Sequence, residues 1–407
     1  MGLGRLAVIV GLAAAAAGAC NRQVPAAETL TAGERLGRLL FFDERLSANG
    51  NQSCATCHEP TTGWTGPVEP INQAGGVYEG SIAGRFSNRK ANSAAYATSA
   101  PTFHLADADE GDFVGGNFWD GRATGERLGN PAADQALGPF LNPVEQALPD
   151  ERAVVERVCG GPYSDLFKQV WGTTVCEDVD RAFERIGLSI AAYEGSAEVN
   201  QFSSKYDAYL AGRAELTGQE MRGLRLFEGQ GRCADCHPHT PGPDGLPPVF
   251  TDFTFDNLGL PKNPANPYYT QPDNPAGALW VDEGLGGFLA GRAEYAQYAA
   301  GNVGKHRVPT LRNVDLRPSP DFVKCYGHNC YFKDLKTFVH FYNTRLVLPV
   351  CAEASPRSGV DCWPRPESEA NVNTEELGNL GLTNEDEDAI VAFLATLSDG
   401  YLPPDRH

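Results

Sequence analysis

Two copies of the pattern Cys-x-x-Cys-His constrain this chain more than any other feature. The first is CATCH at residues 54–58, and the second is CADCH at residues 233–237. This pattern is the attachment signature of c-type haem, in which two thiols bind the haem edge and the histidine ligates the iron. Two copies in one chain therefore predict two covalently bound haem c groups. The predicted haem-binding residues are Cys54, Cys57, His58, Cys233, Cys236 and His237.

An internal repeat precedes each motif with identical spacing. Its members are Thr31, Glu34 and Gly37 before the first motif, and Thr217, Glu220 and Gly223 before the second. Thr-x-x-Glu is a capping box, in which both side chains bind free backbone N–H groups at a helix start. Leucines follow at helical spacing in both copies, which predicts an apolar stripe. A capped helix is therefore expected to lead into each haem site.

The chain is predicted to be mainly α, with two cytochrome c-like haem domains, long loops and few strands. Its 407 residues are enough for two domains, placed at residues 21–205 and 206–407. The last helix is expected to be able to pack back on the first domain. Glycine, proline and asparagine are frequent over residues 241–275, which predicts long loops there. Further helices are predicted at residues 150–158, 179–193, 333–342 and 385–397.

Residues 1–20 have the features of a secretory signal. Arg5 precedes a short apolar run, and small residues stand directly before Cys20. Small residues before a cysteine resemble a bacterial lipobox, so Cys20 is predicted to be lipidated; ordinary cleavage nearby would leave it unmodified. Either way we expect an exported, periplasmic protein, attached to the membrane only through a possible lipid on Cys20.

Charge and cysteine content add two constraints. Lys and Arg number 33 and Asp and Glu 52, a net charge of −19, which argues against nucleic acid as a partner. The chain has 11 cysteines, and six remain after one lipid site and four haem thiols. An oxidising compartment favours disulfides between these six. Their predicted pairs, which are local in the sequence, are Cys159–Cys176, Cys325–Cys330 and Cys351–Cys362.

The supply of axial haem ligands separates an electron carrier from an oxidant. Methionine is nearly absent, since Met1 leaves with the signal and Met221 is more typical of a core residue on the helix before the second motif. The histidines outside the motifs are His104, His239, His306, His328, His340 and His407. The usual histidine–methionine ligation of electron-transfer haems is therefore not expected.

Several fragments together resemble the bacterial di-haem cytochrome c peroxidase and MauG superfamily. The resemblance extends over residues 30–400, and its combination of motifs is specific although no single fragment is. The fragments that carry it are Phe118-Trp119-Asp120-Gly121-Arg122, Gln135 to Pro139, Asn142 to Glu145, Val308 to Val314, and His328 to Lys333.

The resemblance implies that the first haem is the peroxidatic one. Gln135 and Glu145 match the polar residues over its open face, and Pro139 matches a neighbouring pocket residue. A glutamate there can take a proton from one peroxide oxygen and deliver it to the other. A neutral amide can hold the peroxide without competing for that proton. On its own, Glu145 would more readily be interpreted as a carboxylate at a helix entry, and the motif around it favours catalysis.

Two differences from the pattern of many cytochrome c peroxidases favour the MauG branch. Histidine is absent between His58 and His104, so the loop that blocks the first iron in many peroxidases offers no imidazole here. The first haem is therefore expected to be five-coordinate. The position of the second haem's distal ligand is Tyr342, where peroxidases have methionine and MauG-like enzymes have tyrosine. Tyr342 could instead be a core aromatic, and His340 and His328 remain weaker candidate ligands.

The resemblance also implies a link between the two haems. Trp119 matches a tryptophan that relays an electron hole between them, although a buried tryptophan is by default core packing. A shared bis-Fe(IV) state is implied, with His237 and Tyr342 on the second iron. A calcium ion is implied between the haems, with Asn92 as one ligand and carbonyl donors within residues 317–320.

Three functions are compatible with these residues. The first is a MauG-like di-haem peroxidase that uses hydrogen peroxide to oxidise or modify a partner protein. The second is a cytochrome c peroxidase that removes peroxide with electrons from a small cytochrome or cupredoxin. The third is a di-haem electron carrier, which would need two six-coordinate haems and for which the chain lacks ligands. The first is the preferred interpretation.

Overall fold

The computed structural model describes residues 30–242, 245–352 and 357–403. The signal segment and Cys20 lie outside these residues. Helices dominate, and the strands form two small antiparallel pairs: β1 (His104–Asp107) with β2 (Asp112–Val114), and β3 (Phe255–Asp256) with β4 (His306–Arg307). The mainly α prediction is therefore confirmed. Over the described ranges, no helix has both the length and the apolar character that a bilayer span requires.

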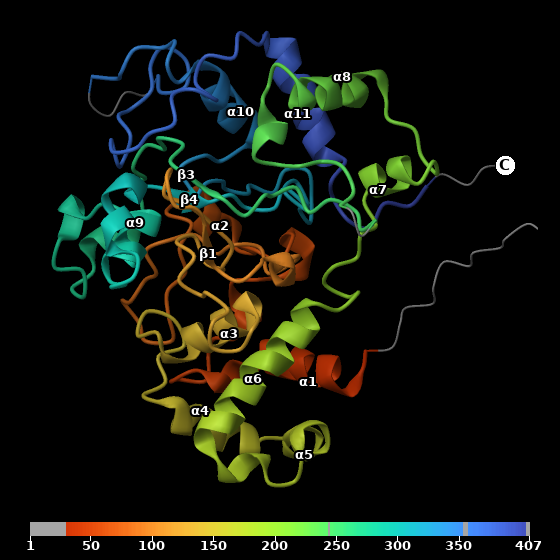
Figure 1. Ribbon diagram of the computed structural model, residues 1–407, viewed down its shortest axis with the longest axis vertical. Coiled ribbons are helices and arrows are strands. Elements are labelled where there is room, and N and C mark those ends of the chain that lie inside the picture. Colours follow the sequence, from red (N-terminus) through yellow and green to blue (C-terminus); the bar gives the residue numbers. More distant parts are fainter. Residues whose placement is uncertain (1–29, 243–244, 353–356, 404–407) are drawn as a thin grey trace, which may run out of the picture.

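The first half of the chain forms a helical unit at the lower end of the molecule in Figure 1. Two helices, α1 and α3, pack on the long helix α6, and their buried side chains belong to one cluster that runs from Leu36 to Val199. The helices of this unit are α1 (Ala32–Phe41), α3 (Pro131–Leu141), α4 (Glu151–Cys159), α5 (Ser164–Trp171) and α6 (Val179–Glu194).

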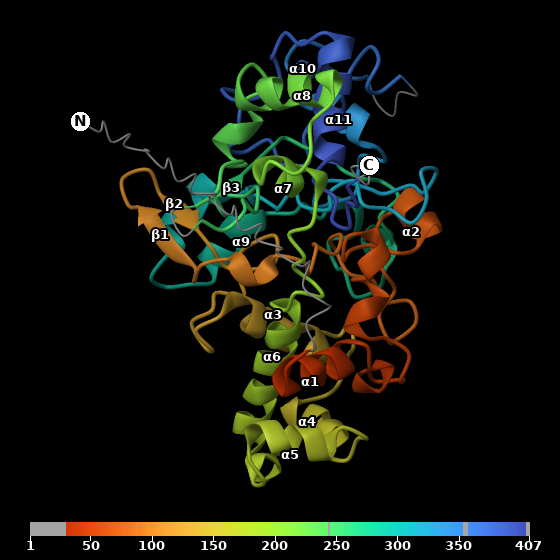
Figure 2. The same ribbon diagram turned by 90° about the vertical axis from the view of Figure 1, so that its right-hand side faces the viewer.

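The second half forms a similar unit at the upper end (Figures 1 and 2). Here α8 and α10 both pack on the last helix, α11, and a second buried cluster runs from Tyr206 to Leu397. The two large clusters thus lie on either side of residue 205. The helices are α7 (Lys205–Leu210), α8 (Gly218–Glu228), α10 (Leu335–Thr344) and α11 (Asn384–Ala395).

A middle layer joins the two units. It holds α2 (Glu69–Gln73), α9 (Gly284–Ala290) and both strand pairs, and a small aromatic cluster there combines Phe103 and Phe113 with Phe255. Short 3-10 turns lie within the loops. They are η1 (Glu44–Leu46), η2 (Cys54–Thr56), η3 (Pro60–Thr62), η4 (Ala97–Ser99), η5 (Val175–Glu177), η6 (Cys233–Asp235), η7 (Pro267–Thr270), η8 (Gly277–Leu279), η9 (Ala296–Tyr298) and η10 (Ala300–Asn302).

The internal repeat has the same structural role in both units. Each threonine caps its helix and forms the predicted capping box with its glutamate. The glycine two turns into each helix lies at a helix crossing. A Cβ on Gly37 would come within 1.9 Å of the Ser189 carbonyl oxygen on α6, and one on Gly223 within 1.9 Å of the Ala389 carbonyl oxygen on α11. Only glycine allows these backbones to approach so closely.

Alanine at either crossing should therefore destabilise the protein. We expect Gly37→Ala and Gly223→Ala each to lower the free energy of unfolding by about 1–3 kcal/mol, because a backbone carbonyl cannot rotate away from the added methyl group. The matched control is Gly218→Ala at the start of α8, where a Cβ meets nothing within 4 Å. Thermal unfolding of the three variants measures the effect, and equal stability of all three would contradict it.

Most predicted elements are confirmed, with one correction. The four further helices appear as α4, α6, α10 and α11, and the three predicted disulfides form. The expectation that the last helix packs back on the first unit is wrong, since α11 packs mainly on α8. Residues beyond that helix contact the first unit: the Tyr96 hydroxyl donates to the Asp399 carboxylate at 2.7 Å, and the Tyr401 backbone N–H donates to the Ser203 carbonyl at 2.9 Å.

Candidate functional site

The two Cys-x-x-Cys-His motifs adopt the same local structure. Each begins with a 3-10 turn, η2 or η6, and ends in a histidine whose Nδ1 faces a backbone carbonyl. For His58 the carbonyl is that of Trp64 at 3.2 Å, and for His237 it is that of Phe250 at 2.7 Å. A carbonyl only accepts, so Nδ1 donates and Nε2 keeps its lone pair. This is the usual orientation of a histidine that ligates a metal.

Burial keeps both rings neutral. It lowers the pKa of His58, and it lowers the pKa of His237 to about 4. A neutral imidazole is the form that ligates a metal. The four cysteines of the motifs stand outside the disulfides, so their thiols are available for thioether bonds.

The first cavity, of about 1240 Å³ with its open mouth, collects every residue predicted for peroxide chemistry. His58, Gln135, Pro139 and Glu145 all line it. Helix α3 provides Gln135 and Pro139, which lie one turn apart and so share a face. The turn after α3 provides Glu145, whose backbone N–H donates to the Asn142 carbonyl at 3.0 Å.

Two opposing influences set the acidity of Glu145. Burial raises the pKa of its carboxyl above the ordinary value, although Arg122 and a hydrogen bond from Asn142 oppose the rise. In that bond, Asn142 Nδ2 donates to Glu145 Oε2 at 2.9 Å. A carboxyl with a raised pKa in a cavity is better suited than an ordinary glutamate to accept a proton and return it.

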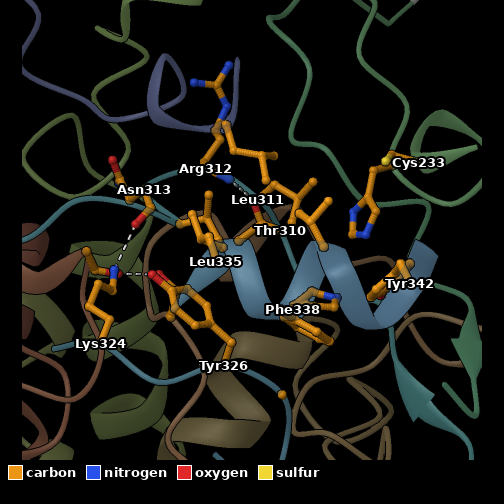
Figure 3. A pocket seen from close by; sticks show the side chains of 18 of the residues that line it. Cys233, Thr310, Leu311, Arg312, Asn313, Lys324, Tyr326, Leu335, Phe338 and Tyr342 are labelled. Carbon is orange, nitrogen blue, oxygen red and sulfur yellow. Dashed lines mark hydrogen bonds between the residues drawn. The ribbon is translucent and has the colours of Figure 1, made fainter. Parts of the chain in front are cut away.

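The second cavity, of about 1210 Å³, brings Cys233, His237 and Tyr342 together. Figure 3 shows Tyr342 and Phe338 on one side of α10, one turn apart, with Cys233 across from them. Burial raises the pKa of the Tyr342 phenol well above its ordinary value. The phenol therefore stays protonated unless a bound metal cation stabilises the phenolate.

The weaker candidate ligands are placed differently. His340 lies on α10 with its Nδ1 2.8 Å from Glu387 Oε1 on α11, and it does not line either haem cavity. His328 lines a side chamber of the second cavity, stacked on another histidine. Met221 packs against the second buried cluster, as expected for a core residue.

Trp119 forms part of the wall between the two cavities. Its side chain lines both of them and is only 9% exposed. The indole Nε1 donates to the Lys90 carbonyl at 2.8 Å, and the Trp119 carbonyl accepts from the Arg307 backbone N–H at 2.8 Å. The first contact orients the indole, and the second holds the backbone that carries it.

Two residues that the sequence did not single out also line the cavities. Arg307 borders both, burial lowers its pKa to about 10, and its Nε has no hydrogen-bond partner within the described ranges. A buried guanidinium needs an anion, and a haem carboxylate fits this position. Glu194 lines the first cavity, and burial raises its pKa to about 8. Neither belongs to a motif of its own: Arg307 directly precedes the Val308 to Val314 fragment, and Glu194 reads as one polar residue on an amphipathic helix.

The donor set therefore fits a haem c in each cavity. Cys54 and Cys57 line the first cavity, whereas Cys233 lines the second and Cys236 its side chamber. Each cavity also has a neutral histidine with its Nε2 available, and Arg307 borders both. In addition to these groups, the first cavity has the Glu145 carboxyl and the Gln135 amide, and the second has the Tyr342 phenol.

Comparison with known proteins agrees with this assignment. Residues 31–215 match the family described as di-haem cytochrome c peroxidase. The chain is 37% identical over 394 residues to the methylamine utilization protein MauG of Paracoccus denitrificans, an alignment covering 96% of this chain and 93% of that protein. It is 31% identical over 285 residues to the cytochrome c551 peroxidase of Nitrosomonas europaea, covering 69% of this chain and 65% of that one.

Solved structures give the same result. A diheme peroxidase of Burkholderia thailandensis superposes with a TM-score of 0.73 at 30% identity, over 92% of this chain and 87% of that one. A MauG-like protein associated with microbial copper homeostasis superposes with a TM-score of 0.62 at 25% identity, over 94% of both chains.

Proposed function

The chain belongs to the di-haem cytochrome c peroxidase family that includes MauG, and from this premise we propose that it uses hydrogen peroxide to oxidise or modify a partner protein. As a member of this family it is an enzyme, a di-haem peroxidase, and it binds two haem c groups. The partner, the order of events and the roles of individual residues are the proposal.

One observation carries the proposal, namely the asymmetry of the two cavities. Among the described residues that line the first cavity, His58 is the sole imidazole, and the polar side chains there include Glu145 and Gln135. Tyr78 also lines this cavity, but its hydroxyl already accepts from the Val68 backbone N–H at 2.9 Å. The second cavity offers both His237 and the Tyr342 phenol. The first iron would thus keep an open position for peroxide, while the second would be held on both sides.

When bound, the two haems would supply the two electrons that cleave the O–O bond of peroxide and would then hold the two oxidising equivalents. Glu145 takes the proton from one peroxide oxygen and returns it to the other, which then leaves as water. Gln135 donates a hydrogen bond to the retained oxygen and cannot compete for the proton. Pro139 interrupts the helical hydrogen bonding of α3 next to these two residues and so shapes the rim of the cavity.

Tyr342 and Trp119 connect this chemistry to the second cavity. An anionic phenolate on the second iron would stabilise its oxidised form, as in tyrosine-ligated catalases. Trp119 borders both cavities and would carry an electron between them. Oxidation could then proceed through the surface of the enzyme, without a pocket for the partner protein.

The proposed location and partner follow from chemistry. Three disulfides and thioether-bound haems indicate an exported, periplasmic enzyme, with a lipid on Cys20 as the possible anchor. The net charge of −19 would steer a basic or dipolar partner toward it. Peroxide removal fed by a small cytochrome or cupredoxin is the second candidate, because relatives carry the peroxidase name as well as the MauG name.

A direct experiment separates the two candidates. Exported proteins encoded next to this gene would be incubated with the holoenzyme and peroxide, and their intact masses recorded. A stable mass change on a tryptophan or tyrosine, abolished by omitting peroxide, is the expected result. Steady oxidation of a reduced small cytochrome with no mass change on any neighbour would favour peroxide removal instead.

The calcium expected between the haems fits these residues only in part. Asn92 Oδ1 is buried without a partner among the described residues and could bind a cation. The carbonyl directly before the expected donor stretch, that of Leu316, is already used, however. Lys324 Nζ donates to the carbonyl oxygens of Thr62 at 2.9 Å, Asn313 at 3.0 Å and Leu316 at 2.9 Å (Figure 3 shows the contact with Asn313). Burial lowers the pKa of Lys324, but three carbonyl acceptors need three N–H donors, which only the ammonium form has. We therefore propose that the Lys324 ammonium supplies the positive charge at this place.

Removal of calcium should consequently have little effect. Dialysis of the holoenzyme against a calcium chelator is expected to leave the rate of the peroxide reaction within about twofold of the untreated value, since the fixed ammonium remains. Metal analysis should find far less than one calcium for every two irons. One tightly held calcium per chain, with activity lost on chelation and restored by calcium chloride, would contradict this proposal.

A further inference from the structure

The loop of residues 117–123 carries an arginine, Arg122, that the proposed peroxide chemistry does not use. Backbone hydrogen bonds close this loop: the Asn117 N–H donates to the Ala123 carbonyl at 2.9 Å, and the Ala123 N–H donates to the Asn117 carbonyl at 3.4 Å. Within the loop, Phe118 has a φ of 63°, which bulky residues rarely adopt. Such a conformation persists only where the surrounding contacts fix it. The loop therefore presents Arg122 in a defined position.

Two contacts hold the guanidinium of Arg122. Its Cζ lies 3.7 Å from the centroid of the Phe118 ring, and its Nη1 donates to both oxygens of Asp120, at 2.9 and 2.8 Å. Both contacts with the carboxylate use Nη1, which leaves Nε and Nη2 available to other acceptors. Stacking on an aromatic ring and pairing with a carboxylate both favour a charged arginine in a fixed orientation.

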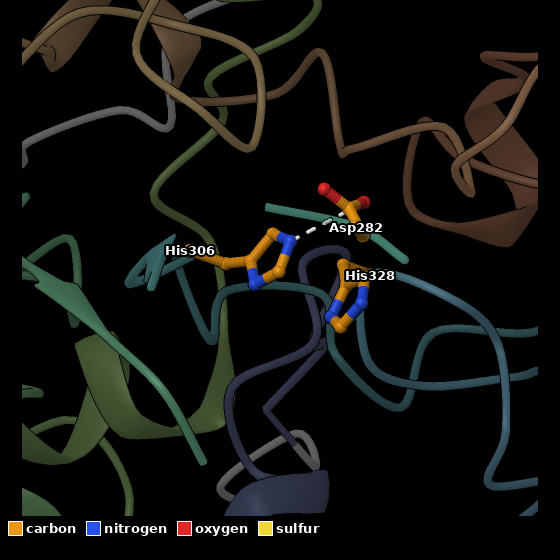
Figure 4. A group of neighbouring side chains, drawn as sticks. All are labelled: Asp282, His306 and His328. Carbon is orange, nitrogen blue, oxygen red and sulfur yellow. Dashed lines mark ion pairs between the residues drawn. The ribbon is translucent and has the colours of Figure 1, made fainter. Parts of the chain in front are cut away.

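A second arginine fixes Asp120 in turn. Arg89 Nη1 donates to Asp120 Oδ2 at 2.6 Å, and Arg89 also donates to both oxygens of Asp282, each at 2.6 Å. Asp282 belongs to a buried cluster with His306 and His328, in which His306 Nε2 lies 3.3 Å from Asp282 Oδ2 (Figure 4). Although burial opposes them, the two arginines lower the pKa of Asp120, so this carboxyl is ionised at neutral pH. The anchor of the loop arginine is therefore a fixed negative charge.

Arg122 lies at the mouth of the first cavity. It lines this cavity together with Gln135 and Glu145, and it also lines an open groove on the surface beside α3. Its side chain is 41% exposed, as expected for a residue between a cavity and solvent. Phe118 borders the same two spaces. The guanidinium and the ring on which it stacks therefore form part of the boundary between the peroxide pocket and the groove.

The charge of Arg122 acts on Glu145. Burial raises the pKa of the Glu145 carboxyl, and Arg122 opposes this rise more than the hydrogen bonds from Asn142 and Ser87 do. Outside the cavity, Arg85 is paired with an aspartate at 2.9 Å. Besides the haem-binding motif, the titratable groups that line the cavity are Tyr78, Arg89, Lys90, Glu194 and Arg307.

These other groups have partners or are uncharged. Arg89 is held by two aspartates, and Arg307 lies in the wall between the cavities, where a haem carboxylate fits. Lys90 donates from Nζ to a hydroxyl at 2.9 Å and to a backbone carbonyl at 3.1 Å. Burial raises the pKa of Tyr78, and it raises that of Glu194 to about 8, so both are largely uncharged at neutral pH. The arginine at the mouth therefore provides the positive charge near the proposed base.

We propose that Arg122 is a positioning residue for the peroxide reaction: its fixed guanidinium keeps the Glu145 carboxylate ionised and so ready to take the proton from peroxide. This inference rests on the proposed acid–base role of Glu145. A positive charge stabilises the ionised form, so its removal raises the pKa of the carboxyl. The rate should then begin to fall at higher pH than in the wild type. On the alkaline side the carboxylate is ionised with or without the arginine, so the rate there should not change.

Two neutral variants of Arg122 test the proposal. Arg122→Gln removes the charge, and Arg122→Met removes it while keeping a flexible stem over Phe118. Stopped-flow absorbance would measure the reaction of each ferric holoenzyme with hydrogen peroxide across a range of pH. On the acid side we expect rates at least about threefold below the wild type, a modest effect because the arginine is partly exposed. Arg122→Lys keeps a positive charge and should restore much of the wild-type profile.

The matched control is Arg127→Gln. Arg127 lines the same surface groove, lies over a phenyl ring as well and is 42% exposed, but it is not among the described residues that line the first cavity. Its pH profile should match that of the wild type. An equal shift in this control would assign the effect to the overall charge of the protein and overturn the proposal.

Infrared spectra give a readout that does not depend on turnover. Spectra of the ferric holoenzyme recorded against pH would follow the carboxyl band that disappears in Glu145→Gln. We expect the midpoint of this band at higher pH in the neutral variants, judged on whichever of the two keeps the haem absorption bands. An unchanged midpoint would overturn the proposal, and rates lowered equally at every pH would show a merely structural role. A shifted midpoint, with a wild-type rate that is independent of pH, would support the action of Arg122 and contradict the acid–base role of Glu145 instead.

Discussion

Replacement of Glu145 by glutamine is expected to slow the reaction of the protein with hydrogen peroxide by about 10²–10⁴-fold, the usual contribution of a positioned acid–base group. Glutamine has nearly the same shape but cannot take up a proton. In the wild-type protein, the ionised carboxylate is the active base, so the rate should fall as the pH drops through its pKa. Because burial raises that pKa, the fall should occur at higher pH than for an ordinary glutamate. The variant should lose this pH dependence.

Stopped-flow absorbance across a range of pH gives both quantities. The control is Glu177→Gln, which changes an exposed carboxylate of the same unit and should react like the wild type. If the Glu145→Gln protein reacts at the wild-type rate, or if its rate still falls at low pH as in the wild type, then Glu145 does not transfer the proton.

Replacement of Tyr342 should have the second large effect, this time on the second haem. Tyr342→Phe keeps the ring against Phe338 and removes the phenol oxygen, so the iron should lose an axial ligand and its resting spectrum should change spin state. Tyr342→Met should keep six-coordination and raise the reduction potential by on the order of 0.1 V or more, within the roughly 0.8 V range that axial ligands span. Electron paramagnetic resonance and a redox titration measure these changes.

Two controls make this result specific to Tyr342. Tyr326→Phe alters another buried phenol that lines the same cavity, and it should leave the spectrum of the second haem unchanged. His340→Ala tests the alternative ligand, which contacts Glu387 in the structure and should also have no effect on that spectrum. A spectral change in His340→Ala, with none in Tyr342→Phe, would exchange the two assignments.

The local features of the fold could be predicted because short-range chemistry determines them. The capping boxes at Thr31 and Thr217 depend on side chains three residues apart, and the disulfides join cysteines close in the sequence. Helix α3 was harder to predict, since Pro139 lies inside it and the pattern around it is rich in alanine. The packing of α11 on α8 depends on the close approach of the Ala389 backbone to Gly223, and the hydrophobic periodicity of the sequence does not predict this contact.

The site could be predicted in part. The residues that could not be predicted are those whose roles depend on contacts between segments far apart in the sequence. Motif spacing located His58 and His237, and the resemblance pointed to Glu145 and Tyr342. Arg307 stands out only because its buried Nε has no hydrogen-bond partner among the described residues, and a sequence pattern cannot show this. The same is true of Lys324, whose ammonium donates to carbonyls from two segments that are far apart in the sequence.

The cluster around His306 was also beyond the sequence. Its side chains come from residues 282, 306 and 328, which are far apart in the sequence. Only the folding of the middle layer brings them together, and only the geometry shows that His306 Nε2 and His328 Nε2 have no hydrogen-bond partner among the described residues.

The central claim is that the protein, as isolated with both haems ferric, is ready to react with peroxide. The most direct test mixes this ferric protein with one equivalent of hydrogen peroxide, without any reductant, and follows the absorption bands of both haems. An open first haem and a tyrosine-ligated second haem predict that both sets of bands change within seconds. Bands that stay unchanged until the protein has been half-reduced would contradict the account.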